Sequence, residues 1–135
     1  MTAPHVLHSD GAARGNPGPA AIGAVLFAPG RLEPVAVVSE AIGRATNNEA
    51  EYRALLAGLE AALAAGVTHL LVRLDSELLV QQATGGYRVK AANLKPLFAR
   101  LRVLIGRFTS IAFEHIPRER NAIADDLANA ALDRG

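Results

Sequence analysis

The sequence predicts a single α/β domain in which helices cover a mixed β-sheet. The first third of the chain holds β-rich segments separated by glycine and proline turns, which is typical of antiparallel strands. The rest alternates strand-like and helix-like segments, which implies parallel pairing and helices packed on the sheet. The chain has 135 residues, half of them apolar and 20% charged, which fits one globular domain.

Three β segments open the chain. Val6–Ser9 is a strand that leads into Asp10 and Gly11 at its end, and the stretch Gly11–Pro19 is rich in turn residues. Two further strands, Ala20–Phe27 and Pro34–Ile42, flank a turn at Pro29-Gly30, so we expect an antiparallel meander.

Thr46 marks the change from strands to helices. Thr46 with Glu49 three residues later is a capping-box pattern, and it predicts a helix that runs to about Ala65 and ends at Gly66. The segments that follow are a strand at Thr68–Leu74, helices at Ser76–Thr84 and Leu94–Gly106, a strand at Thr109–Ile116 and a helix at Asn121–Leu132.

The composition excludes several classes of protein. A net charge of +1 excludes a polybasic nucleic-acid-binding protein, although a local basic patch on an enzyme remains compatible with it. The absence of cysteine excludes disulfide scaffolds and cysteine-based zinc sites. The N-terminus has no signal-peptide pattern, and no apolar run approaches the roughly 18 residues of a membrane span, so we expect a cytoplasmic protein with no membrane contact.

Four carboxylates stand where packing favours apolar residues. Asp10 and Asp75 end predicted strands, Glu51 shares a helix stripe with small and apolar residues, and Asp125 lies on the last helix. Each has an ordinary alternative: a turn residue for Asp10, a helix charge that extends to solvent for Glu51, a helix cap for Asp75 and a solvated surface position for Asp125. Taken together they indicate one site, because functional groups gather at the carboxyl ends of parallel strands.

Clustered acids need a counter-charge. Their mutual repulsion raises pKa values and costs stability, and a hard divalent cation with oxygen ligands removes that cost. A pair of Mg²⁺ ions clamps the attacking and leaving oxygens of a phosphodiester. Without cysteine or paired histidines, zinc is a poor competitor for this site.

The ordered motifs of the chain resemble type 1 ribonuclease H over essentially its whole length. These motifs are Ser9-Asp10-Gly11, Asn16-Pro17-Gly18-Pro19-Ala20, Thr46-Asn47-Asn48 with Glu51-Tyr52, Asp75-Ser76, and Asn121 with Ala124-Asp125. The resemblance implies a five-stranded mixed sheet with helices on both faces, formed by residues 1–135 as one catalytic domain. It also implies metal-dependent cleavage of the RNA strand of RNA–DNA hybrids that leaves 3′-hydroxyl and 5′-phosphate ends.

The resemblance assigns the four acids as ligands of two Mg²⁺ ions, with Mn²⁺ as a substitute. By this analogy Asp10 bridges both ions, Glu51 and Asp75 complete the ion on the leaving-group side, and Asp125 completes the ion that activates water. The chemistry agrees, because hydroxide must form near neutral pH beside positive charge.

The resemblance also assigns residues that bind the hybrid. The resemblance implies that the 2′-hydroxyl, which marks RNA, is read in a shallow groove by the Gly11–Asn16 loop, Asn47 and Glu51. It also implies that Arg44, Thr46 and Asn93 form a pocket for a phosphate of the DNA strand. The substrate-binding residues implied in this way are Gly11, Asn16, Arg44, Thr46, Asn47, Asn48, Asn93 and Arg118. The ordinary alternatives are a turn residue for Asn16, a helix cap for Asn47 or Asn48, and a solvated side chain for Arg44.

Two departures from the family pattern stand out. A basic, tryptophan-rich protrusion is missing, and the short segment Gly85–Ala92 with Arg88 and Lys90 takes its place, which predicts weaker binding and a shallower salt dependence. No histidine occupies the loop before Asp125. We expect Arg118 to serve in place of that histidine, or else to form a salt bridge with Glu119 or Glu114. We expect His115 to be a structural residue.

The sequence therefore predicts an endoribonuclease that acts on RNA–DNA hybrids, as a monomer with no obligatory protein partner. One alternative is a non-catalytic nucleic-acid-binding module with the same fold. The presence of all four acids argues against that alternative, since such a module has no need of them. Another alternative is a related nuclease that also cleaves double-stranded RNA.

Overall fold

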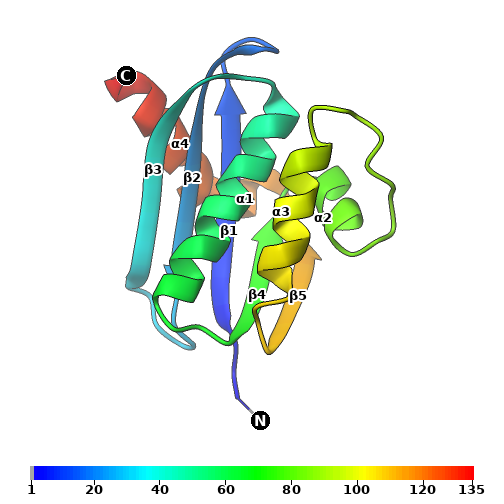
Figure 1. Cartoon of the computed structure of the whole chain (residues 1–135). Coiled ribbons are helices and arrows are strands. Elements are labelled where there is room, and N and C mark those ends of the chain that lie inside the picture. Colours follow the sequence, from blue (N-terminus) through cyan, green and yellow to red (C-terminus); the bar gives the residue numbers. More distant parts are fainter. Residues whose placement is uncertain (1) are drawn as a thin grey trace.

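The central layer of the molecule is a five-stranded sheet in the order β3-β2-β1-β4-β5 (Figure 1). The computed structural model describes residues 2–135. The strands are β1 (His5–Ala13), β2 (Gly18–Phe27), β3 (Pro34–Ala45), β4 (His69–Leu74) and β5 (Ser110–His115). The helices are α1 (Asn47–Ala64), α2 (Glu77–Ala83), α3 (Lys95–Ile105) and α4 (Ala122–Arg134), with a 3₁₀ turn, η1 (Arg118–Arg120), before α4.

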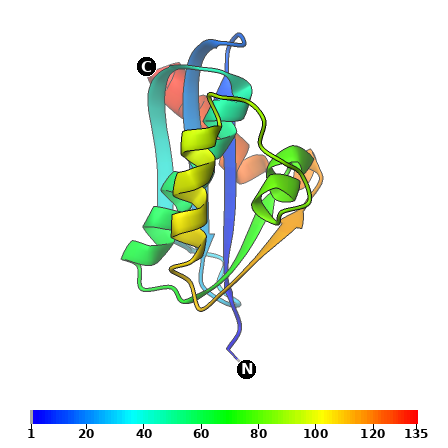
Figure 2. The same cartoon turned by 45° about the vertical axis from the view of Figure 1, so that its right-hand side comes forward.

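The pairing of the strands confirms the predicted mixed sheet. Strands β1, β2 and β3 form the antiparallel meander, and β1, β4 and β5 pair in parallel. Helices α1 and α3 lie on one face of the sheet, and α4 lies on the other (Figures 1 and 2). This arrangement confirms the predicted fold class, with helices on both faces.

The first strand is longer than predicted, so placing Asp10 at its end was wrong. Strand β1 continues to Ala13, because the residues after Asp10 keep their antiparallel partners in β2, from the Gly11–Ile22 pair to the Ala13–Ala20 pair. Gly11 therefore belongs to a strand and not to a turn. On the other side, β1 pairs with β4 only as far as His8. Asp10 thus lies within β1, just beyond the point where the parallel ladder stops.

The third strand also extends past its predicted end. The pairing of β3 with β2 shifts by one residue near Ile42, and the strand then continues to Ala45. Gly43 adopts a φ of 79° beside this irregularity, a conformation that favours glycine. The extension places Arg44 at the end of β3, immediately before the helix that carries Glu51.

The helix starts follow the predicted capping signals. The capping box of α1 is formed, with the Thr46 hydroxyl accepting from the Glu49 N–H and the Glu49 carboxylate accepting from the Thr46 N–H. Ser76 caps α2 by accepting from the Leu79 N–H at 3.2 Å. Because Ser76 occupies the N-cap position of α2, helix capping does not explain why an aspartate stands at position 75.

Most of the hydrophobic core lies between α1, α3 and the sheet. It includes Leu7, Leu26, Leu55, Leu59 and Leu101, all nearly fully buried. Helix α4 covers its face of the sheet with small residues, among them Ala124 and Ala128. Within residues 2–135, no helix has the length and apolar character required to cross a bilayer.

The segment between α2 and α3 is an irregular loop that stands out to one side of the sheet (Figure 2). Arg88 and Lys90 are exposed on it, and Tyr87 is 49% exposed. The structure thus has a short loop where the resemblance led us to expect a reduced protrusion.

Candidate active site

A cleft of about 510 Å³ opens where β4 ends and β1 continues with β2 as its only partner strand. Its wall contains all four acids that the sequence singled out, drawn from two strand segments and two helices. The cleft is lined by Asp10, Gly11, Ala12, Ala13, Arg14, Asn47, Glu51, Asp75, Ser76, Arg118, Asp125 and Asn129.

A close approach between α1 and β1 places Glu51. The Gly11 N–H donates to Glu51 Oε1 at 3.0 Å. A Cβ atom at position 11 would lie 2.2 Å from the carbonyl carbon of Ala50, so only glycine allows the helix to come this near. The contact fixes one oxygen of Glu51 beside the strand that carries Asp10.

A second close approach, on the opposite face, places Asp125. Gly23 pairs with Asp10 across the β1–β2 ladder, and a Cβ atom there would lie 2.2 Å from the Ala124 carbonyl oxygen. Helix α4 therefore passes close over β2 just before Asp125. The Asn129 side-chain amide donates to Asp125 Oδ1 at 3.2 Å and holds that carboxylate from the next turn.

Three of the acids converge on one point. Asp10, Glu51 and Asp75 each offer a carboxylate oxygen, and these oxygens lie within 4.8 Å of one another. Asp125 is outside this group of three, but it contributes with Glu51 to raising the pKa of Asp10. Asp10 is thus flanked by acids from both helices.

The electrostatics of the cluster favour protons or a cation. Burial, followed by the hydrogen bond and negative charge of Glu51 and the charge of Asp75, raises the pKa of Asp10 to about 10. Burial also raises the pKa of Glu51, against hydrogen bonds from Asp10 and the Gly11 N–H. Burial raises the pKa of Asp75 as well, opposed by a hydrogen bond from Asn121 and by the charge of Arg118.

The atoms of the cluster fit a divalent cation. Glu51 Oε2 is buried without a hydrogen-bond partner in the described part of the chain, although its sister oxygen is engaged. A buried carboxylate oxygen without a partner is costly, and coordination by a hard cation would satisfy it. All the candidate donors are carboxylate oxygens, the ligands that Mg²⁺ and Mn²⁺ prefer.

Comparison with known proteins agrees with this geometry. A family model described as reverse transcriptase-like matches residues 8–131. RNase H1 from the halophilic archaeon Halobacterium salinarum has the same fold, with a TM-score of 0.94 and 44% identity over 98% of this chain and 100% of that chain. The chain belongs to the type 1 ribonuclease H family.

Two further relatives support this membership. LC11-RNase H1, whose structure was solved in complex with an RNA/DNA hybrid, is 41% identical, with a TM-score of 0.90 over 96% of this chain and 97% of that one. The bifunctional protein Rv2228c of Mycobacterium tuberculosis is 46% identical over 128 residues, which are 95% of this chain but 35% of that protein. The chain thus spans about a third of the length of this mycobacterial relative.

The ribonuclease H resemblance also named residues around the start of α1, and the structure brings most of them together. The Asn47 N–H donates to the Asn16 side-chain oxygen at 3.0 Å, which joins the turn between β1 and β2 to the helix. Thr46 is the N-cap, and Asn48 is exposed in the first turn. Thr46, and to a smaller extent Asn93, lower the pKa of Glu49.

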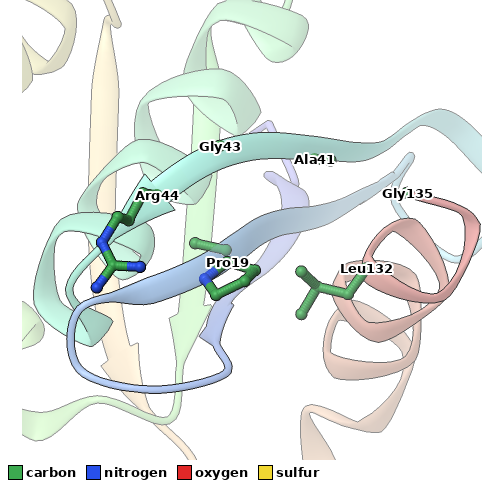
Figure 3. A pocket seen from close by; sticks show the side chains of 7 residues that line it. Pro19, Ala41, Gly43, Arg44, Leu132 and Gly135 are labelled. Carbon is green, nitrogen blue, oxygen red and sulfur yellow. The ribbon is translucent and has the colours of Figure 1, made fainter.

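Arg44 lies at the edge of this group. Its side chain is exposed, and Nη2 donates to the Pro17 carbonyl at 3.4 Å. It also borders an apolar pocket of about 300 Å³ formed with Pro19, Ala41 and Leu132 (Figure 3). In Figure 3 Arg44 lies on the opposite side of this pocket from Leu132.

Two roles were predicted for Arg118, one at the site and one in a salt bridge with Glu119 or Glu114. Arg118 lies on the wall of the cleft, whereas Glu114 pairs with Arg73 at 3.1 Å. No ion pair of Arg118 is present among residues 2–135. His115 is exposed at the end of β5 and is not part of the cleft wall.

Sequence reasoning missed two asparagines at the site. Asn129 holds Asp125 one helical turn away, and Asn121 is buried behind Asp75. The signal for Asn129 was its spacing of four residues from Asp125, which places both on one helix face. Asn121 was visible as a motif residue, but it was interpreted only as the start of the last helix.

Proposed function

We propose that this protein is a metal-dependent endoribonuclease that hydrolyses the RNA strand of RNA–DNA hybrids and leaves 3′-hydroxyl and 5′-phosphate ends. The observation that carries the proposal is the convergence of Asp10, Glu51 and Asp75, with oxygens within 4.8 Å, in an open cleft. Family membership supports it, as does the hybrid complex of the related LC11-RNase H1. Residues 1–135, with one main core, serve as a single catalytic domain.

The four acids hold two Mg²⁺ ions in this proposal, with Mn²⁺ as a substitute. Asp10 would be the shared ligand, because it lies beside Glu51 and Asp75 and pairs with Gly23, the residue that α4 approaches just before Asp125. Glu51 and Asp75 would complete the ligands of one ion, and Asp125 those of the second. When bound, the ions supply a hydroxide near neutral pH and positive charge beside the reacting phosphate.

The protein's own groups hold this arrangement in place. The Gly11 N–H orients Glu51, and Asn129 orients Asp125. Arg118 adds a positive charge at the cleft wall next to Asp75, where it attracts the RNA backbone. Fixed donors of this kind cost no reorganisation during the reaction.

Discrimination of RNA depends on the 2′-hydroxyl in this proposal. Gly11, Asn47 and Glu51 share the cleft wall, and Asn16 is bonded to Asn47. Asn47 and Asn48, exposed at the start of α1, present amide groups to the minor groove.

A phosphate of the DNA strand binds near the start of α1 in this proposal, held by side chains more than by the helix terminus. Two first-turn amides are already engaged, the Asn47 N–H by Asn16 and the Glu49 N–H by Thr46. The side-chain donors in this proposal are the Arg44 guanidinium, the Thr46 hydroxyl and the Asn93 amide. Arg44 supplies the positive charge that this contact needs.

Cleavage of a labelled RNA–DNA hybrid with Mg²⁺ and with Mn²⁺ tests the proposal. Matched double-stranded RNA, single-stranded RNA and DNA run beside it, with EDTA as the metal-free control. We expect hybrid-selective cutting with 5′-phosphate products that EDTA abolishes. Hybrid binding without cutting by either metal would indicate a non-catalytic module, and equal cutting of double-stranded RNA would indicate a broader nuclease.

A further inference from the structure

Asn121 is a buried polar residue directly behind the acidic cluster. It is 1% exposed and precedes α4 as its N-cap residue. Its Nδ2 donates to the Ser9 carbonyl at 2.9 Å, and its Oδ1 lies 3.3 Å from His8 Nδ1. Both partners belong to β1, immediately before Asp10.

These contacts occur where β1 loses its neighbouring strand. The parallel ladder with β4 ends at the His8–Arg73 pair, and β4 itself ends at Leu74. One residue beyond that last pair, the Ser9 carbonyl accepts its hydrogen bond from the Asn121 side chain. A buried carbonyl needs such a partner. The amide of Asn121 therefore takes the place of a partner strand beyond the end of β4, and it fixes the backbone that carries Asp10.

The same residue also contacts the helix that carries another acid. Its backbone carbonyl accepts from the Asp125 N–H at 3.1 Å in the first turn of α4. Asn121 thus links the strand that carries Asp10 to the helix that carries Asp125.

We propose that Asn121 is a positioning residue that sets the spacing of Asp10 and Asp125 and thereby the affinity of the site for a divalent cation. This inference rests on the proposed function, because it takes the acids as cation ligands. An asparagine suits the task, since its side-chain amide donates to the Ser9 carbonyl without adding charge beside the acids. Partners that orient metal ligands typically contribute about 10–100-fold to metal affinity or activity.

A simple structural role is the competing explanation, in which Asn121 only fastens α4 to the sheet. Ser39 provides a matched control for that role. Its hydroxyl donates to the Leu127 carbonyl at 2.6 Å and ties α4 to β3. Ser39 does not line the acidic cleft. The Ser39→Ala variant therefore loosens α4 without touching the acids.

The test compares Asn121→Ala, Asn121→Ser and Ser39→Ala with the unaltered protein. Mn²⁺ binding is measured by titration calorimetry without nucleic acid, and stability by urea unfolding. We expect the Mn²⁺ dissociation constant to rise about 10-fold or more in Asn121→Ala, in line with the effect of lost supporting contacts. Ser39→Ala loses stability but keeps its Mn²⁺ affinity. Asn121→Ser leaves a smaller cavity and carries the test if the alanine variant does not fold.

Unchanged Mn²⁺ affinity in a folded Asn121 variant would overturn the inference. Equal weakening of Mn²⁺ binding by Ser39→Ala would also overturn it, because loosening of α4 would then explain the effect. Hybrid cleavage is assayed separately on the unaltered protein. If that protein binds Mn²⁺ but cuts no hybrid, and Asn121→Ala binds Mn²⁺ weakly, the proposed function fails and the positioning role stands.

Discussion

Gly23 faces Asp10 directly across the β1–β2 ladder, and its missing side chain lets α4 carry Asp125 up to Asp10. The backbone of α4 occupies the space that a side chain at position 23 would fill, with the Ala124 carbonyl oxygen 2.2 Å and the Ala128 nitrogen 2.7 Å from an added Cβ. The position of Asp125 on α4 therefore depends on a glycine in β2.

Replacement of Gly23 by alanine tests this dependence. The added methyl group must push α4 away from β2, and overpacking of this kind costs about 1–3 kcal/mol. We expect the urea unfolding midpoint to fall and cleavage to fall with it, because Asp125 moves away from Asp10. Gly106→Ala is the control, since its Cβ would meet nothing nearer than 3.5 Å. Equal stability of the two variants would show that α4 does not depend on the glycine.

Replacement of Asp10 by asparagine separates the catalytic role of this acid from its effect on stability. The variant keeps the size of the side chain and removes a negative charge beside Glu51 and Asp75. We expect cleavage to fall about 10³-fold or more, because a bound ion contributes several kcal/mol to the reaction. Without metal, the variant is as stable as the original protein or more stable, since a buried amide needs no proton to stay neutral whereas the Asp10 carboxylate must take one up on folding. Cleavage at the original rate would contradict the site assignment.

The raised pKa values of Asp10, Glu51 and Asp75 also predict how stability changes with pH. In the unfolded chain these groups ionise near their ordinary values of 3.8 and 4.5, whereas the folded, metal-free protein retains protons on them at higher pH. The folded state then binds more protons than the unfolded state, so stability falls as pH rises above those values. Each fully shifted group contributes up to about 1.4 kcal/mol per pH unit.

Urea unfolding in EDTA between about pH 7 and about pH 9 measures this slope, because histidines are largely neutral there. Burial lowers the pKa of His8, so this imidazole is neutral throughout that range. We expect the Asp10→Asn variant to show a shallower decline. A stability that rises with pH in this range would refute the prediction.

The fold was predictable because its signals are local. Thr46 and Glu49 form the capping box that the sequence indicated, and Ser76 caps the next helix. The end of β1 was mispredicted because Gly11 reads as a turn residue. In the structure it is a strand residue whose lack of a side chain serves the packing of α1. A glycine selected for close approach has the same local signature as a glycine selected for a turn.

The four acids of the site were predictable because they are carboxylates at positions where packing favours apolar residues. Their supporting groups were not, because Asn121 and Asn129 are unremarkable in a sequence. Asn121 matters through the Ser9 carbonyl, which lies 112 positions away along the chain. That contact exists because β4 stops before β1 does. The ends of the two strands cannot be predicted from the sequence accurately enough to reveal the contact.

Replacement of Arg44 by alanine tests the proposed contact with the DNA strand. Arg44 lies outside the acidic cleft, so its loss removes a phosphate contact and leaves the acids in place. We expect KM for the hybrid to rise more than kcat falls, and the slope of log affinity against log salt to become shallower by about 0.9. Arg31→Ala is the matched control, because Arg31 is exposed in the turn between β2 and β3. A lower kcat at unchanged KM would place Arg44 in the chemical step and not in binding.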